Sequence, residues 1–148
     1  MTKVVILIFL GLLRGLISSQ NVGNDKSCRN VVAQLNKLQM TQINSCANQL
    51  GFTTTKERLK KSTCILKCVL QSIGVINHDG SVSAAKLDQY IDDHFPSNLR
   101  QKAHTTFTPC LKLVQPSLST PIGDEYCKSH DNFVKCMTRN FLMLCHQQ

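Results

Sequence analysis

The sequence lacks several patterns that mark common enzyme and membrane classes. It contains no Gly-x-Ser-x-Gly nucleophile elbow and no His-Glu-x-x-His zinc motif, which argues against a serine hydrolase and a zinc protease. After residue 19 no apolar run approaches the roughly 20 residues that cross a bilayer, so stable membrane insertion is not expected. No segment alternates apolar and polar residues as a strand does, and no Asn-x-Ser/Thr sequon is present. These absences argue against an enzyme and give no reason to expect a cofactor.

Residues 1–19 have the layout of a secretory signal peptide. Lys3 precedes an apolar run from Val4 to Leu13, and the segment ends in the small polar residues Ser18 and Ser19. This run is too short to span a membrane. We therefore expect cleavage near Ser19 and a single domain over residues 20–148, secreted into an oxidising extracellular compartment.

The chain has eight cysteines, which an exported protein uses for disulfides rather than for metal or redox chemistry. No cysteine spacing is that of a zinc ribbon. Cys64 and Cys68 lie one turn apart on one helix face, so each should pair with a different element. Cys127 and Cys136 would project to opposite sides of a continuous helix and should also reach different partners. The sequence alone leaves the pairing open.

Apolar residues recur at three- and four-residue spacings through most of the chain, which predicts an all-α fold. The expected helices cover residues 26–50, 55–61, 63–73, 83–94, 97–114 and 121–144. Gly51 and Gly74 are expected to end the first and third helices. Threonines 53–55 and Ser83 offer N-caps, as does Ser97 at the start of the fifth helix. Pro109 predicts a kink or restart just before Cys110, and Pro121 suits the first position of the last helix.

Neither calcium nor nucleic acid fits the polar segments. An EF-hand counted from Asn77 needs Gly at its sixth position and Glu at its twelfth, where this chain has Val82 and Asp88. Removal of residues 1–19 leaves 15 basic and 9 acidic residues, a net charge of +6. The basic cluster 56–61 has no interleaved aromatic residues to stack on bases, so we interpret it as a solvated helix face. No metal site is expected from the histidines, which are scattered over five segments: His78, His94, His104, His130 and His146.

The cysteine spacing resembles that of insect odorant-binding proteins, the pheromone-binding and general odorant-binding proteins. The similarity covers roughly residues 40–140 and includes the Cys-x3-Cys of residues 64–68, the turn containing Gly74 and Asp79-Gly80, and the Cys-x8-Cys of residues 127–136. Only 17 residues separate Cys46 from Cys64, fewer than is usual for the family, so Cys28 is an alternative first cysteine. The resemblance implies the pairs Cys46–Cys68, Cys64–Cys127 and Cys110–Cys136. Cys28 and Cys145 have no counterpart, and a fourth bond between them is the simplest expectation.

The resemblance also implies a fold and a function. We expect a compact bundle of about six helices, cross-linked by disulfides around an apolar cavity. Such a protein is a non-catalytic carrier of a small hydrophobic ligand, such as an odorant, a pheromone or a fatty acid, and a chemosensory receptor is a further candidate partner. The alternative is a secreted disulfide-rich signalling or structural protein without a ligand cavity. Uptake of an apolar ligand by the folded protein discriminates between the two.

Ligand contacts are expected on the inward-facing helical stripes. The candidate contact residues are Phe107, Phe133, Met137, Phe141 and Leu144. The apolar tail 141–145 is expected to pack over the cavity. A Cys28–Cys145 bond would hold this tail to the first helix, so His146 is expected to have little influence on binding as the pH falls.

Overall fold

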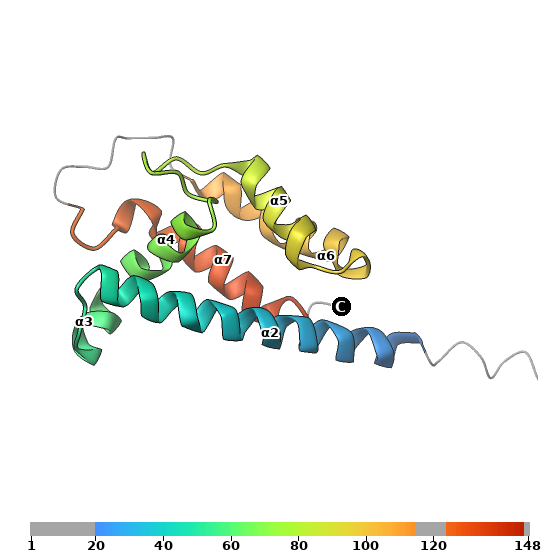
Figure 1. The fold of residues 1–148 in the computed structure, drawn as a ribbon. Helices are drawn as coiled ribbons and strands as arrows, with labels where there is room; N and C mark the ends of the chain where they lie inside the picture. The colour runs from blue at the N-terminus through green and yellow to red at the C-terminus, as the bar shows by residue number, and fades with distance from the viewer. Residues whose placement is uncertain (1–19, 115–123, 147–148) are drawn as a thin grey trace, which may run out of the picture.

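The computed structural model of the protein describes residues 20–114 and 124–146. Within these ranges the chain forms six α-helices and two 3₁₀ turns (Figure 1). In chain order they are α2 (Gln20–Gln49), α3 (Thr55–Lys60), α4 (Ser62–Ser72), α5 (Ala84–His94), α6 (Ser97–Phe107), η1 (Thr108–Leu113), η2 (Lys128–His130) and α7 (Asp131–Met143). The all-α prediction is confirmed. The expected signal peptide and the expected helix start at Pro121 lie outside the described residues.

In the first half of the chain, the residues predicted to start or end helices do so. Gly51 and Gly74 follow α2 and α4 with φ of 74° and 78°, a left-handed conformation that glycine adopts without steric cost. Thr54 caps α3: its hydroxyl accepts from the Glu57 N–H at 3.2 Å, and the Glu57 carboxylate accepts from the Thr54 N–H at 3.0 Å. This reciprocal pair is a capping box. Ser83 caps α5 through the Lys86 N–H.

The fifth predicted helix divides into α6 and η1. Ser97 is not its N-cap: the cap is Pro96, in an extended conformation, and Ser97 is the first helical residue. The Pro96 carbonyl accepts from the Leu99 and Arg100 N–H groups, so the N-cap lies one residue earlier than predicted. The expected break before Cys110 occurs as a change to 3₁₀ geometry at Thr108.

The last helix begins later than the sequence predicts. Residues 124–127 form a turn in which Cys127 has φ of 53°, and α7 starts only at Asp131. Cys127 and Cys136 are therefore not on one continuous helix, and the prediction that placed them there is wrong. The Asp124 carboxylate accepts from the Lys128 N–H at 2.7 Å and the Ser129 N–H at 3.1 Å, so these amides are satisfied by a side chain instead of a preceding helical turn.

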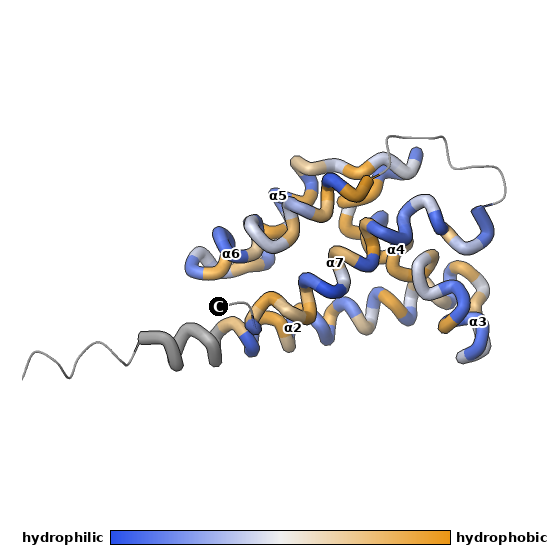
Figure 2. Tube along the Cα trace, turned by 180° about the vertical axis from the view of Figure 1, so that it is seen from behind, coloured by the Kyte–Doolittle hydropathy of each residue, from blue (hydrophilic) through white to orange (hydrophobic). Residues whose placement is uncertain are grey.

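The helices form three levels in Figures 1 and 2, which view the molecule from opposite sides. Helix α2 runs along one side, α4 and α7 lie in the middle, and the α5–α6 pair covers the opposite side. Figure 2 shows the more hydrophobic stretches of α4, α5 and α7 toward the interior. The main core joins residues of α5, α6 and α7, and a smaller cluster between α2 and α4 surrounds Cys46.

All eight cysteines form disulfides, which tie every level to another. Cys28–Cys145 joins α2 to the residues after α7, Cys46–Cys68 joins α2 to α4, Cys64–Cys127 joins α4 to the turn before η2, and Cys110–Cys136 joins η1 to α7. The first of these is the bond expected for the two additional cysteines, and the others are the pairs implied by the resemblance.

Candidate functional site

An apolar pocket lies between the three levels of the bundle. Its volume is about 240 Å³. Helices α2, α4, α5 and α7 all contribute to its wall, together with Phe95 after α5 and Phe107 at the end of α6. Among the described residues, all lining residues except Asn36, Gln39, Tyr90 and Thr138 have aliphatic, thioether or phenyl side chains, and none is Lys, Arg, His, Asp or Glu. Whatever the pocket holds must therefore present an uncharged, largely apolar surface.

The deepest part of the pocket is formed where α5 meets α6. Leu87, Ile91, Phe95 and Phe107 are almost completely buried there. The rings of Phe95 and Phe107 lie 6.2 Å apart between centroids, tilted by 51°. These residues belong to the main core, so the same packing that stabilises the fold also shapes the inner end of the pocket.

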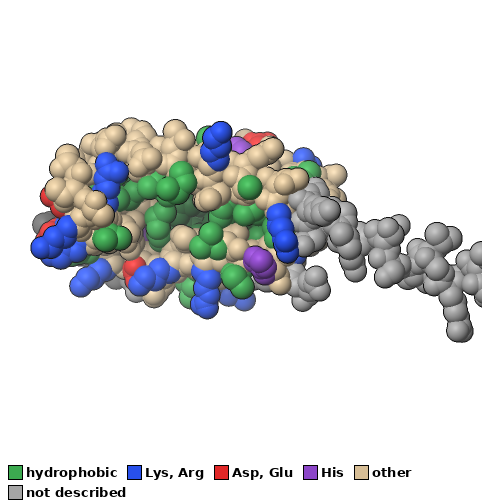
Figure 3. Space-filling view, turned by 90° about the horizontal axis from the view of Figure 1, so that it is seen from below, with side chains coloured by type: hydrophobic (Ala, Val, Ile, Leu, Met, Phe, Trp, Pro, Cys, Tyr) green, Lys and Arg blue, Asp and Glu red, His purple; other side chains and the backbone are tan. Residues whose placement is uncertain are grey.

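The pocket opens between α2 and the end of α7. Asn36 and Met40 on α2 and Leu142 on α7 are exposed lining residues, whereas Phe141 beside Leu142 is buried. Figure 3 shows apolar side chains gathered in a hollow on the face seen from below the view of Figure 1, with Lys and Arg side chains near its edge. The opening is thus apolar with a basic surround.

Tyr90 is the one ionisable group that the described residues contribute to the pocket wall. Its ring stacks on that of His94, with 4.2 Å between centroids. Burial raises the pKa of Tyr90, so the phenol stays protonated at neutral pH. Its hydroxyl has no hydrogen-bond partner within residues 20–114 and 124–146, so it can bond to a polar group of a ligand.

Three of the five predicted contact residues line the pocket: Phe107, Met137 and Phe141. Phe133 and Leu144 do not. They are 1% and 0% exposed and lie in the main core beside it. Phe133, Met137, Phe141 and Leu144 share one apolar stripe of α7 and the residues after it. The stripe is wide, so some of its side chains face the pocket and others pack against neighbouring side chains.

The sequence reasoning missed the contribution of α4 and α5. The two helices and the residue that follows α4 contribute seven lining residues: Leu66, Val69, Leu70, Ile73, Leu87, Tyr90 and Ile91. The inward stripes of both helices were visible in the sequence as periodic apolar positions. Nothing in that periodicity separates a side chain that faces an opening from one that meets another side chain.

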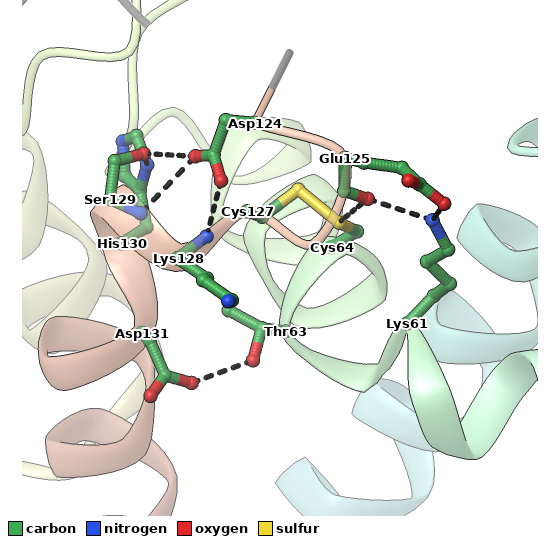
Figure 4. Close-up of a disulfide and its surroundings, with 10 residues drawn as sticks. All are labelled: Lys61, Thr63, Cys64, Asp124, Glu125, Cys127, Lys128, Ser129, His130 and Asp131. Carbon is green, nitrogen blue, oxygen red and sulfur yellow. Dashed lines mark hydrogen bonds and ion pairs between the residues drawn. A yellow bond between two sulfur atoms is a disulfide. The ribbon is translucent and has the colours of Figure 1, made fainter. Parts of the chain in front are cut away.

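A polar cluster around the Cys64–Cys127 disulfide lies away from the pocket (Figure 4). Lys61 bonds the Glu125 carboxylate at 2.5 Å and its carbonyl at 3.0 Å, and the Lys61 ammonium lies 4.1 Å from the centre of the Tyr126 ring. The Thr63 hydroxyl donates to Asp131 at 2.8 Å. On one side of the bond Lys61 therefore fixes the turn that carries Cys127, and on the other Thr63 of α4 fixes the start of α7.

His130 links this cluster to the turn between α4 and α5. Its Nε2 lies 2.8 Å from the Gly80 carbonyl oxygen, which can only accept, so Nε2 carries the hydrogen. Ser129 Oγ lies 2.8 Å from His130 Nδ1 and 2.6 Å from the Asp124 carboxylate. His130 is buried and does not line the pocket, so we assign it a structural role.

Several carboxyl groups of this region are held ionised. Burial raises the pKa of Asp124, but the hydrogen bonds from Ser129 and Lys128 outweigh it, and the pKa lies below its ordinary value. Hydrogen bonds from Lys135 and Thr63 lower the pKa of Asp131, and the hydrogen bond from Lys61 lowers that of Glu125. These carboxylates stabilise the folded state at neutral pH.

In the described part of the chain, no group of three or more His, Cys, Asp or Glu side chains is placed to hold a metal ion. None of the helices in that part is both long and apolar enough to cross a membrane.

Fold and pocket together define a class: small helical proteins closed by disulfides around an apolar pocket. The PBP/GOBP family model matches residues 26–140 of the chain, which therefore belongs to this family. The family consists of carriers that bind small hydrophobic ligands. No match was found among curated proteins or among solved structures.

Proposed function

We propose that this protein is a secreted carrier that takes one small hydrophobic molecule into the pocket between α2, α4, α5 and α7. The observation that carries the proposal is the pocket wall, which is predominantly apolar and to which the described residues contribute no charged side chain. No cysteine is free, and the described residues place no Lys, His, Asp or Glu in the wall, so they offer no thiolate, imidazole or carboxylate for chemistry on the contents of the pocket. The function that this pocket supports is the binding and release of a ligand.

The size of the pocket limits the ligand. Ligand pockets of drug-sized molecules span about 300–1,000 Å³, and this one, at about 240 Å³, lies just below that range. A single-chain alcohol, ester or aldehyde of moderate length matches it better than a two-chain lipid. Each methylene buried contributes roughly 0.8 kcal/mol, which corresponds to about a fourfold change in Kd. The Tyr90 hydroxyl can bond to a single polar group.

A chain-length series tests this proposal. A fluorescent apolar probe is bound to the purified protein and displaced by straight-chain alcohols from hexanol to hexadecanol. We expect the Kd to fall about fourfold with each added methylene and then to level off at the length that fills the pocket. Absence of any saturable displacement would favour the signalling or structural alternative.

A matched pair of variants locates the site. Leu70→Phe enlarges a side chain in the pocket wall and should shift the preferred alcohol to a shorter chain. Leu113→Phe makes the same change at an exposed position of η1 that does not line the pocket, and should leave the series unchanged. Equal length profiles for both variants would place the binding site elsewhere.

A further inference from the structure

A second hollow meets the pocket at its opening. It lies between the start of α4 and the outer face of α7, and its volume is about 550 Å³. We call it the outer groove; its lining residues are Ser62, Thr63, Leu66, Val134, Lys135, Thr138, Arg139, Leu142 and Met143. Three of these, Leu66, Thr138 and Leu142, also line the pocket. The two spaces are therefore neighbours that share a wall, and among the described residues only the outer groove is lined by charged side chains.

The outer groove differs from the pocket in its charge. Lys135 and Arg139, one turn apart on α7, both line it, and no Asp or Glu of the described part of the chain does. Lys135 is already paired, because its ammonium lies 2.6 Å from the Asp131 carboxylate. Arg139 is exposed and makes no hydrogen bond or ion pair with any residue in 20–114 or 124–146. The groove thus presents one guanidinium whose positive charge no neighbouring carboxylate balances.

We propose that the outer groove binds the anionic head group of a single-chain amphiphile, with the Arg139 guanidinium as the carboxylate ligand. This inference rests on the proposed carrier function. The alkyl chain enters the pocket across Leu66, Thr138 and Leu142, and the head group stays outside. None of the described residues of the pocket wall is a cation, so a carboxylate inside the pocket would lose its hydration without gaining a charged partner there.

The donors available at the shared wall support this orientation. The Thr138 hydroxyl already donates to the Val134 carbonyl at 2.9 Å, so its hydrogen is not free for a carboxylate. Arg139 offers five N–H donors in a planar fork that matches a carboxylate with two parallel bonds. The rival position for a head group is the Tyr90 hydroxyl, which lines the pocket but not the outer groove. Arg139 is the stronger site because it carries the opposite charge.

The test compares dodecanoate with dodecanol, which has the same number of carbons and no charge. Probe displacement is measured at pH 7.5, where a carboxyl group of ordinary pKa is ionised. Arg139→Gln should weaken dodecanoate binding by up to about fivefold, the upper end of what an exposed ion pair contributes, and leave dodecanol binding unchanged. Lys112→Gln removes a charge of the same sign at an exposed site that lines neither space, and should leave the Kd of both ligands unchanged.

Two further measurements test the role of charge. Arg139→Lys should retain part of the dodecanoate affinity. Added salt should weaken dodecanoate binding more than dodecanol binding in the wild type.

Two results would overturn the head-group site while leaving the carrier function intact. One is an unchanged Kd for dodecanoate in Arg139→Gln, or an equal loss for both ligands. The other is a selective loss of dodecanoate binding in Tyr90→Phe, which would place the head group inside the pocket. If the wild type binds neither ligand, the carrier proposal itself fails and the head-group site with it. Circular dichroism of each variant checks that the fold is retained.

Discussion

Removal of the Cys28–Cys145 disulfide should destabilise the protein and loosen the pocket together. This bond joins α2 to the residues just after α7, across a sequence separation of 117. Buried Leu144 and the pocket residues Phe141 and Leu142 lie directly before it. The double replacement Cys28→Ala and Cys145→Ala keeps the other three disulfides and removes only this constraint.

The expected loss follows from the length of chain that the bond closes. A loop of 117 residues considered alone corresponds to roughly 5 kcal/mol. The other disulfides shorten the covalent path, which runs from Cys28 to Cys46, across to Cys68, back to Cys64, across to Cys127 and on to Cys145. That path has about 40 residues, so the chain-entropy estimate falls to about 4 kcal/mol.

Urea unfolding at neutral pH, followed by circular dichroism, measures this difference between wild type and variant. Ligand displacement with a straight-chain alcohol measures the effect on the pocket, which should be weaker binding in the variant. Since the bond holds the tail at the pocket, wild-type affinity should change little between neutral and mildly acidic pH, and the variant should be more pH-sensitive. A free-energy loss under 1 kcal/mol, with affinity and pH profile unchanged, would refute this account of the tail.

Two further predictions concern stability alone. The pKa values of Asp79, Asp124, Glu125 and Asp131 lie below the ordinary 3.8 for Asp and 4.5 for Glu, so the unfolded chain binds more protons at acid pH. The Tm should therefore stay level from pH 7 to about 5 and fall below about pH 4.5; a Tm that rises on acidification contradicts this sign. Thr54→Ala removes the capping box of α3 and should cost about 1 kcal/mol in urea unfolding, whereas Thr53→Ala, one residue before the cap, should cost almost nothing. Equal losses would show that the cap is not responsible.

The parts of the fold that the sequence predicted are those fixed by local chemistry. Gly51, Gly74, Thr54 and Ser83 each end or start a helix through their own backbone or side chain, so their effect is readable without knowing the neighbours. The start of the last helix was not predictable in the same way. Its apolar spacing continues back to Tyr126, but Asp124 and the Cys64–Cys127 bond hold the chain in a turn there. That competition depends on α4, which is remote in sequence.

The candidate site was predicted in outline and not in detail. Helical periodicity identified the inward faces, and Phe107, Met137 and Phe141 on those faces do line the pocket. It could not separate them from Phe133 and Leu144, because a buried side chain follows the same period whether it meets an opening or a neighbour. The outer groove could not be predicted from the sequence for another reason. It arises from the packing of α4 against α7, which places Leu66 and Arg139 in the wall of the same hollow.

The most direct test of the carrier account is an NMR measurement of where a bound ligand lies. Isotopically labelled dodecanol is added to the folded protein at equal concentration, and nuclear Overhauser contacts are recorded between its chain and the protein side chains. We predict one bound molecule, with contacts from its chain to Ile91, Phe107 and Met137 in the pocket. Binding at several surface positions, with no contact to these three residues, would contradict the account.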